Sequence, residues 1–587
     1  MIRVNDFNKN TIPALLCNRA TYSSADLCFC YPQLRQAYTW SELFQGVRTL
    51  SESFFKSGIK KGDRIAILME NRIELVISMF AAATVGAVAI PLNTYSKKEE
   101  LKTYLLDAKP VILIIGKAGQ QLHYPRLINE IVAESKNDLI TPSWIPPQIF
   151  VLDEAVDAAY PFKPFSSLLN DKDQMADDAF LDLCNATFTT DPAFLIYTSG
   201  TTGIPKGVAR SCASFLVLDN SEGGFSGKIK SKLSRMGDRY MRRFSLMNLL
   251  PLYHMGGIGM IFTSLKFANF RTVMLTHFNP VNALKAADSE KCNFLVGTPF
   301  MLQYMLSSKS AENVQLNSVL GVAFTSSAVN SQIIERITGE LRNLYFFTVS
   351  YGSSEAGAVA NGSCFFNKNR NMLVSVLLRL LRSTRLLNGE IKYEEFTRTE
   401  HSIGGKIDKN VEVAIIDTRT GAFLDIHSEG EIVIRSHRVM HYIHDNLTKE
   451  SFLQDGWYRS GDLGFIDKNG NLLITNRIKR LISRGGEKIS PVEIENVLLR
   501  NPAVADVFVL AVPDDLYGEE ICAAFVEKEG AELSVEKLRN EISNSLSQFK
   551  TPKYFVSLPA FPLSPSGKIS VPEIKRLVME KIKLNYA

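Results

Sequence analysis

The stretch AFLIYTSGTTGIPKG, residues 193 to 207, joins a short apolar run to a loop of hydroxyl residues, glycines and a lysine. Three similar apolar runs precede it, namely IAIL (65–68), VAIPL (88–92) and VILII (111–115), and helical patterns lie between them. Short apolar runs that alternate with helical patterns are typical of an α/β chain whose strands are largely parallel and buried. The sequence therefore predicts an α/β fold.

The loop after this predicted strand has the composition of an anion-binding site. Its glycines allow backbone amides to approach an anion closely, its hydroxyl groups donate to phosphate oxygens, and its lysine neutralises their charge. Its spacing differs from the Walker pattern, because neither Gly200 nor Gly203 is followed by four residues and then Gly-Lys-Ser/Thr. The loop predicts a polyphosphate cradle, and an ordinary polar surface loop is the alternative.

The overall composition limits the class of protein. The chain has 587 residues, and at about 150 residues per domain this length predicts several folding units. Apolar residues make up 45% and charged residues 22%, which excludes fibrous and disordered classes. Lysine and arginine together number 66 against 61 acidic residues, an excess too small to predict nucleic acid as a partner.

The cysteines and the amino terminus bear on the cellular compartment. The eight cysteines are scattered, and the nearest pair, Cys28 and Cys30, lacks the spacing and histidine partners of a zinc site. The first ten residues contain no signal sequence. Two uncharged stretches, 75–96 and 244–265, contain small residues and prolines that argue against a membrane span. We therefore expect a cytoplasmic protein with reduced cysteines.

The later parts of the chain differ from the first part in composition and in the pattern of apolar residues. Residues 141 to 190 are irregular and rich in Pro, Asp and Ser, which predicts a surface connection. The runs VEVAIID (411–417) and GEIVIRS (430–436) predict strands of a smaller β-rich subdomain. From residue 492, the runs VEIENVLLR and VADVFVLAV and a helical pattern near 534–547 predict a compact α+β module.

Seven motifs occur in a fixed order along the chain. The loop 197–207 is the first of them. The others are PLYH (251–254), YGSSE (351–355), YRSGD (458–462), RIK (477–479), GGEKISP (485–491) with EIE (493–495), and SGKI (566–569). These motifs resemble those of the acyl-adenylate-forming superfamily, which comprises acyl-CoA and aryl-CoA synthetases, adenylation domains and luciferases. Weaker similarity begins near YTW (38–40), so the resemblance covers nearly the whole chain.

The resemblance implies a two-step reaction and a two-part architecture. A carboxylate attacks the α-phosphate of ATP to give acyl-AMP and pyrophosphate, and a thiol, usually that of CoA, then displaces AMP. The implied fold has a large N-terminal adenylation domain, residues 1–476, with flavodoxin-like parallel sheets and a β-barrel-like subdomain. A small, mobile α+β domain, residues 477–587, follows it, with a hinge near Lys479.

The resemblance also assigns residues to the nucleotide. Asp462 is expected to accept hydrogen bonds from the ribose hydroxyls, with Arg477 nearby, while Tyr351 and Ser327 lie beside adenine. The β- and γ-phosphates are expected to contact Lys206 and the loop residues Thr198, Ser199, Gly200, Thr201, Thr202 and Gly203.

Further residues are assigned to the chemistry. Glu355 is the implied Mg²⁺ ligand, a hard carboxylate for a hard cation, and Ser354 beside it contacts phosphate. Lys568 is the implied catalytic lysine of adenylation, which reaches the substrate carboxylate and the α-phosphate. His254 is expected to line the acyl site, and Lys488 to lie on the face that binds CoA.

Several positions depart from the pattern of the superfamily. Ser354 stands where threonine is common, Asn476 where glycine is usual, and Arg480 where an acidic residue is frequent. The segment TSSA (325–328) replaces the usual Ser-Gly-Gly-Ala beside adenine and the acyl pocket. Two added hydroxymethyl groups at a place of close approach predict a restricted pocket and a shortened or partly polar acyl group.

The sequence leaves the substrate and the acyl acceptor open. Amino-acid-selecting adenylation domains usually carry an aspartate in the region of residues 252–256, and here there is none. No carrier or condensation domain flanks the sequence, so we expect a free organic acid, aliphatic rather than aromatic. The leading interpretation is an ATP-dependent acyl-CoA synthetase. The alternatives are an enzyme that loads a separate acyl carrier protein, an aryl-CoA ligase, and a catalytically silent nucleotide-binding protein.

One segment predicts contact with a membrane surface. Within residues 371–387, five polar residues recur at helical spacing on a leucine-rich background: Asn371, Ser375, Arg379, Arg382 and Arg385. Three arginines on one stripe would suit anionic lipid headgroups. The alternative is a helix that docks on its own domain or on a partner.

Overall fold

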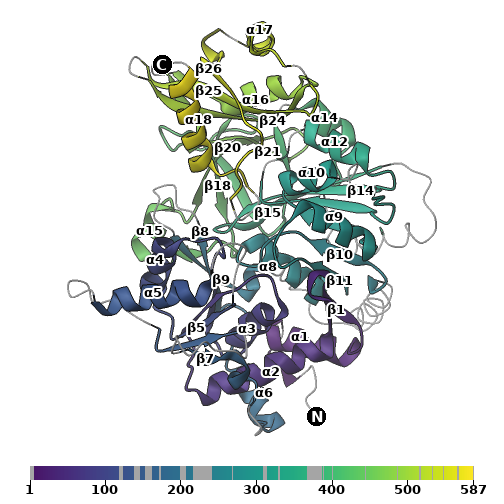
Figure 1. Ribbon diagram of the computed structural model, residues 1–587, viewed down its shortest axis with the longest axis vertical. Coiled ribbons are helices and arrows are strands. Elements are labelled where there is room, and N and C mark those ends of the chain that lie inside the picture. The colour runs from purple at the N-terminus through teal and green to yellow at the C-terminus, as the bar shows by residue number, and fades with distance from the viewer. Residues whose placement is uncertain are drawn as a thin grey trace.

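We describe the protein from a computed structural model. It covers residues 6–8, 10–117, 123–137, 146–152, 162–170, 174–198, 206–215, 241–267, 269–308, 314–327, 329, 331–366, 378, 387, 389–399, 401–442, 444–484, 487–514, 517–531, 533–546, 548–564 and 568–585. Figure 1 shows an elongated molecule in which the first two hundred residues lie at one end and the last hundred at the other.

The helices of the described residues cover the faces of three sheets. Their bounds are α1 Ile12–Tyr22, α2 Trp40–Lys56, α3 Ile73–Thr84, α4 Lys98–Ala108, α5 Tyr124–Asn137, α6 Asp177–Asn185, α8 Met255–Phe262, α9 Pro280–Ser289, α10 Pro299–Ser307, α12 Ser331–Glu340, α14 Tyr393–Arg398, α15 Asp445–Glu450, α16 Pro491–Leu499, α17 Val535–Ser545 and α18 Val571–Asn585.

An eight-stranded sheet contains the four apolar runs expected to be strands. Its order is β19 (His441–Tyr442), β9 (Lys206–Ser211), β8 (Pro192–Thr198), β4 (Val88–Pro91), β3 (Arg64–Leu68), β5 (Ile112–Ile115), β6 (Gln148–Val151) and β7 (Lys163–Pro164). The strands from β8 through β4, β3, β5, β6 and β7 pair in parallel. Both faces of this sheet are covered. Residues of α3 pack on one face in one apolar core, and residues of α4 and α5 pack on the other face in a second core.

The expectation of an irregular surface connection over residues 141–190 is wrong in part. Residues 148–151 form β6, which pairs with β5, and Phe150 and Val151 are buried. The segment also contains α6, whose Phe180 and Cys184 pack against α1. A strand of four residues next to two prolines is too short for its periodicity to be recognised, and only its pairing with β5 stabilises it.

A thirteen-stranded sheet forms the middle of the molecule. Its order is β17 (Glu412–Ile416), β18 (Gly430–Arg435), β20 (Tyr458–Ile466), β21 (Asn471–Arg477), β16 (Ser402–Ile407), β15 (Gly357–Phe365), β14 (Phe346–Ser353), β13 (Gly321–Phe324), β12 (Phe294–Gly297), β10 (Ser245–Asn248), β11 (Arg271–Met274), β1 (Leu27–Tyr31) and β2 (Gln36–Thr39). In this order, neighbouring strands between β14 and β1 pair in parallel, and neighbouring strands between β17 and β14 pair antiparallel.

The α/β class is therefore confirmed. The β-rich subdomain expected after residue 405 is the antiparallel part of the large sheet, and the described strands run in an open order from β17 to β2 without closing into a barrel. Its own apolar core contains Ile415, Ile432 and Leu472. The chain from residue 6 to residue 477, which holds both large sheets, is called the main body below.

The last part of the chain, residues 482–585, is called the terminal module. Its sheet contains β22 (Ile482–Arg484), β23 (Glu487–Ile489), β24 (Val504–Asp514), β25 (Gly518–Glu527) and β26 (Tyr554–Ser557). One face of this sheet packs against α16 and α17 and the other against α18. The predicted α+β module is thus confirmed, with a core of its own on each face.

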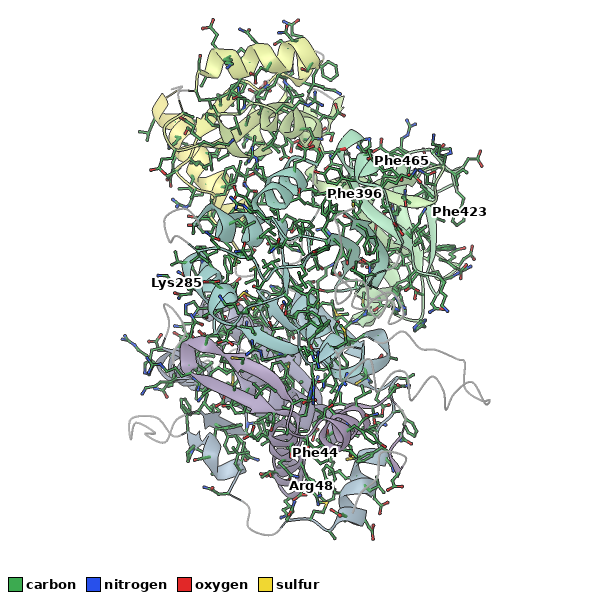
Figure 2. All side chains as sticks on the ribbon, turned by 90° about the vertical axis from the view of Figure 1, so that its right-hand side faces the viewer. Phe44, Arg48, Lys285, Phe396, Phe423 and Phe465 are labelled. Carbon is green, nitrogen blue, oxygen red and sulfur yellow. The ribbon has the colours of Figure 1, made fainter. Side chains whose placement is uncertain are left out.

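Polar side chains fix the helices at the N-terminal end of the molecule. Thr39 caps α2, since its hydroxyl accepts from the amide of Glu42 while the Glu42 carboxylate accepts from the amide of Thr39. Arg48, labelled in Figure 2, is buried and donates to Glu52 and to Asp177 at 2.8 Å each. Because Glu52 lies in α2 and Asp177 in α6, the bond to Asp177 ties α2 to α6 and the bond to Glu52 holds the guanidinium in place.

Two expectations about membranes can be compared with this fold. Within the described residues, no helix combines the length and the apolar character needed to cross a bilayer. The predicted peripheral stripe over 371–387 lies outside the described residues except for Leu378 and Leu387. Both of these leucines are buried in the core of the large sheet, and membrane contact by the arginines stays a prediction.

Candidate active site

The two large sheets meet where the predicted phosphate loop begins and ends. β8 ends at Thr198 and β9 begins at Lys206, and these two residues are paired across the strands. The turn between β14 and β15 carries Ser354 and Glu355. The Thr198 hydroxyl donates to the Glu355 carboxylate at 3.4 Å. Strands that are far apart in the sequence thus bring the base of the predicted phosphate loop to the predicted metal ligand.

A buried arginine that the sequence analysis missed holds the backbone of this turn. Arg210 on β9 is 2% exposed, and its Nη1 donates to the Glu355 carbonyl at 3.2 Å and to the Arg438 carbonyl at 2.5 Å. Burial lowers its pKa to about 10, although the Glu355 carboxylate acts in the opposite direction. Gly357 has a φ of +73°, and a Cβ there would lie 2.8 Å from Arg210 Nη2, so this turn requires glycine.

The signal for Arg210 was present in the sequence. In the strand KGVARS (206–211), Val208 and Arg210 lie two residues apart and share the buried face. An arginine at a core-facing position of a strand is almost never buried without a partner. Period-two analysis of this strand would therefore have marked Arg210 as a residue with a specific acceptor.

Tyr351, Asp462 and Arg477 form a hydrogen-bonded group beside the turn. The Tyr351 hydroxyl donates to Asp462 Oδ2 at 2.8 Å, and Arg477 Nε donates to Asp462 Oδ1 at 2.7 Å. The antiparallel register of β20 and β21 pairs Asp462 with Arg477 directly. Burial, and then the Asp462 carboxylate, raise the pKa of Tyr351, so the phenol stays protonated as a donor. Each Asp462 oxygen keeps a further lone pair for a ligand.

Lys568 of the terminal module lies close enough to this group of side chains for their charges to act on it. Partial desolvation of the Lys568 ammonium group lowers its pKa, and the Arg477 guanidinium lowers it further. The carboxylates of Glu355 and Asp462 act in the opposite direction. The Lys568 amide donates to Ser564 Oγ at 3.2 Å, and Ser564 N donates to the Lys568 carbonyl at 2.6 Å. The backbone of this turn thus carries the lysine to a region where an anion would be stabilised.

His254 lies at the start of α8, the helix that follows the PLYH motif. It is half-buried at the N-cap position, and its ring centroid lies 4.6 Å from that of Tyr253. Desolvation, and then the positive charge of Lys568, lower the pKa of His254 to about 3. The Pro251–His254 loop is held by Asn71, whose side-chain oxygen accepts from Leu252 N at 2.9 Å. His254 is therefore a neutral imidazole near the lysine.

We expect His254 to stay neutral throughout the range of pH 8 to 5. In the unfolded chain the pKa of His254 would lie near 6.5. Between pH 6.5 and about 3, only the unfolded chain binds the proton. The contribution of His254 to the free energy of unfolding therefore decreases as the pH falls through this range. NMR titration of the eight histidines, with His254→Gln to assign the signal, measures this directly. A His254 midpoint close to 6.5 would contradict the expectation.

The segment 325–327 faces the first turn of α8. Ser326 has a φ of +69°, the left-handed region that favours glycine. A Cβ on Gly256 would lie 3.0 Å from the Ser326 hydroxyl oxygen, so this hydroxyl contacts the helix that follows His254. Ser327, by contrast, is exposed. The two serines that depart from the superfamily pattern therefore have different surroundings.

Some of the expected site residues cannot be placed. Ser199, Gly200, Thr201, Thr202 and Gly203 lie outside the described residues, as does the side chain of Lys488. Among the residues that the structure does describe, no group of three or more His, Cys, Asp or Glu could hold a metal ion. A metal held by the described residues would have to be shared between few protein ligands and a substrate.

Comparison with known proteins identifies the family of the chain. Residues 18–443 match the family described as AMP-binding enzyme, and residues 493–568 match the AMP-binding enzyme C-terminal domain. The chain belongs to the AMP-binding enzyme family. The two matched regions lie within the main body and within the terminal module, and the AMP-binding enzyme match includes Thr198, Glu355 and His254.

Individual relatives of this AMP-binding enzyme cover nearly its whole length. The mitochondrial medium-chain acyl-CoA ligase ACSF2 of Danio rerio is 26% identical, over 93% of this chain and 84% of the relative. Among solved structures, a Mycobacterium tuberculosis fatty acyl CoA synthetase has a TM-score of 0.63 at 21% identity, covering 97% of this chain and 99% of the other. ATP-bound MatB from Rhodopseudomonas palustris has a TM-score of 0.69 at 21% identity, covering 98% and 100%. The solved structures show that the fold is shared.

Proposed function

We propose that this AMP-binding enzyme activates a carboxylic acid as acyl-AMP and transfers the acyl group to the thiol of CoA. One observation carries the proposal: Asp462 is held between Tyr351 and Arg477 of the main body, and Lys568 of the terminal module lies near enough for its charge to interact with Asp462 and Glu355. Two cations and two carboxylates on different segments suit a nucleotide whose phosphates are neutralised and whose ribose is held. The ACSF2 relative is named as a medium-chain acyl-CoA ligase, which agrees with this function.

In the first half-reaction, an oxygen of the substrate carboxylate attacks the α-phosphorus and the bond to the pyrophosphate oxygen breaks. The protein contributes by positioning and by charge neutralisation. Asp462, held between Tyr351 and Arg477, accepts from the ribose hydroxyls. Lys568 stabilises the negative charge that develops between the carboxylate and the α-phosphate. Lys206, with the loop that precedes it, binds the terminal phosphates.

The residues present fit a magnesium ion bound jointly with ATP. Mg²⁺ usually takes one or two protein carboxylates plus substrate phosphates, and Glu355 supplies one carboxylate next to the hydroxyl of Thr198. When bound, the ion would neutralise charge on the phosphates. The backbone of Glu355 is held by Arg210 and by the amide of Met440, which donates to the Glu355 carbonyl at 2.9 Å.

The second half-reaction needs the thiol to reach the acyl carbon, and we propose that the terminal module turns between the two steps. The domains we propose are residues 1–476 and 477–587, with the hinge near Lys479. The contacts on either side of this residue support the position. Arg477, which ends β21 and stands at this boundary, still pairs with Asp462 of the main body, whereas Arg480 pairs with Glu495 of the terminal module at 2.6 Å and lies over the Phe508 ring. Such hinges absorb changes in few backbone dihedrals.

Two residues that depart from the superfamily pattern, Arg480 and Asn476, both have hydrogen-bond partners in this structure. Arg480, at a position where an acidic residue is frequent, finds the Glu495 carboxylate and the Val509 carbonyl as acceptors. Asn476, at a position where glycine is usual, donates to Ser490 Oγ of the terminal module at 3.1 Å. Both substitutions therefore have partners and are compatible with a functional enzyme.

We propose a fatty or other aliphatic acid of limited length as the substrate, with Ser326 restricting the pocket. Ser326→Gly removes a hydroxymethyl group that contacts α8, so kcat/KM should shift toward longer acids by about tenfold, or about 1.4 kcal/mol. Ser327→Gly, at the exposed neighbour, is the matched control and should leave the chain-length profile unchanged. An unaltered profile in Ser326→Gly would show that this hydroxyl faces away from the acyl group.

The proposed function is tested by carboxylate-dependent exchange of pyrophosphate into ATP. A panel of aliphatic and aromatic acids identifies the substrate class, and omission of Mg²⁺ tests the metal. Thioester formation is then measured with CoA and with an acyl carrier protein as acceptors. We expect exchange with an aliphatic acid and transfer to CoA. Absence of exchange with every acid would mean that the nucleotide site is catalytically silent.

A further inference from the structure

The main body also touches the terminal module through Arg336 on α12 and Gln303 on α10. Arg336 Nη1 donates to the Ala505 carbonyl at 2.5 Å, and its Nη2 donates to the Val504 carbonyl at 3.0 Å. Gln303 Nε2 donates to the same Ala505 carbonyl at 3.3 Å. Figure 1 shows α10 and α12 next to the terminal module. Three hydrogen bonds therefore join two helices of one part to one short segment of the other.

The accepting carbonyls are available because β24 begins with an irregularity. Val504 pairs with Glu527 and Asp506 pairs with Val526, so the register shifts between them and Ala505 is an extra residue. A bulge of this kind leaves its residue out of the ladder and redirects its polar groups. The Ala505 carbonyl is thus presented to Arg336 and Gln303.

Arg336 is held firmly on the side of the main body. Its neighbours on α12, Ile334 and Ile337, are buried in the core of the large sheet. Arg336 itself is half-buried, and burial lowers the pKa of its guanidinium, while the Asp506 carboxylate acts in the opposite direction. A partly desolvated guanidinium is costly unless its donors are paired. The carbonyls of Val504 and Ala505 supply that pairing in the present arrangement of the two parts.

We propose that Arg336 is a positioning residue that holds the terminal module in the orientation presenting Lys568 to Glu355 and Asp462. Rotation of the terminal module about residues 478–480 would carry Val504 and Ala505 away from α12. The hydrogen bonds of Arg336 therefore exist in one orientation only, and an interaction present in one of two states shifts the equilibrium toward it. This inference rests on the proposed function, in which that orientation serves adenylation.

The role predicts a split between the two half-reactions. Arg336→Met keeps the length of the side chain and removes its donors, so the orientation for adenylation should be less populated. The kcat for pyrophosphate exchange should fall by about tenfold, a usual size for coupling between two states. Thioester formation from supplied acyl-AMP and CoA should be unchanged or faster. Arg336→Lys, which retains a cation, should recover part of the exchange rate.

Matched controls separate this role from general destabilisation. Arg342→Met makes the same substitution at an exposed arginine just beyond α12 and should change neither half-reaction. Melting temperatures of all variants report on folding. If Arg336→Met lowers both half-reactions by the same factor, or neither, Arg336 does not set the orientation and the proposal is overturned.

A second measurement is independent of activity. All eight cysteines of the chain are buried, so fluorophores can be attached selectively to Thr420→Cys in the main body and Lys537→Cys in the terminal module, both at exposed positions. Single-molecule energy transfer should resolve two populations, one for each orientation of the terminal module. The second population should be larger in Arg336→Met than in the unaltered protein. If no acid supports exchange, the proposed function fails. If the energy-transfer distributions of Arg336→Met and the unaltered protein are identical, the role of Arg336 is overturned, whatever the result of the exchange assay.

Discussion

Lys568→Ala should reduce adenylation by about two to three orders of magnitude while largely preserving thioester formation from supplied acyl-AMP. The charge of this lysine acts on Glu355 and Asp462, and in the proposed reaction it offsets charge on the reacting carboxylate and α-phosphate. Loss of one preorganised charge-stabilising group typically costs about this much in rate. Pyrophosphate exchange measures the first half-reaction, and CoA thioester formation measures the second.

The structure indicates that this variant will fold. The hydrogen bonds between residues 564 and 568 use the backbone of Lys568, which alanine retains. Lys575→Ala, at an exposed position on α18, is the matched control and should leave both half-reactions intact. Equal loss of both half-reactions in Lys568→Ala, with an unchanged melting temperature, would argue against a role confined to adenylation.

Glu355→Gln should have the second-largest effect, with adenylation reduced by about a hundredfold or more. The amide is nearly the same size as the carboxylate but is a poor ligand for Mg²⁺. It also leaves the positive charges of Arg210 and Lys568 without a neighbouring carboxylate that now favours them. The measurement is the Mg²⁺ dependence of pyrophosphate exchange, which should move to higher concentrations of the ion.

The conservative variant and a distant control complete this test. Glu355→Asp keeps the charge and should retain more activity than Glu355→Gln, with a higher requirement for Mg²⁺. Glu536→Gln, at an exposed position in α17, should behave as the unaltered protein does. If Glu355→Gln shows the normal Mg²⁺ dependence, Glu355 does not bind the ion and the metal ligand must be sought elsewhere.

Much of the fold could be predicted because its determinants are local. The apolar runs near residues 65, 88, 111 and 193 are strands, since each is short, rich in branched residues and followed by a turn or helix signal. The α+β character of the terminal module was equally visible. β6 was missed because its four residues carry no periodicity of their own, and its strand conformation depends on the neighbouring β5.

By itself, the sequence determined the α/β class and the family. The site residues and the phosphate-binding role of the loop after residue 197 stay predictions from ordered motifs. The sequence could not show that Thr198 meets Glu355, or that Tyr351 and Asp462, which are 111 residues apart, share a hydrogen bond. These contacts depend on the order of strands in two sheets, which local patterns do not encode.

Only the tertiary structure revealed the acceptors of Arg210 and Arg336. Each arginine donates to backbone carbonyls of a distant segment, and a carbonyl is present at every residue, so no sequence pattern marks the acceptor. The proximity of Lys568 to Glu355 and Asp462 likewise depends on how the terminal module docks on the main body. The sequence determined which chemical groups the protein possesses, and the packing of the two parts decided which of them meet, because long-range contacts arise from the relative placement of whole elements.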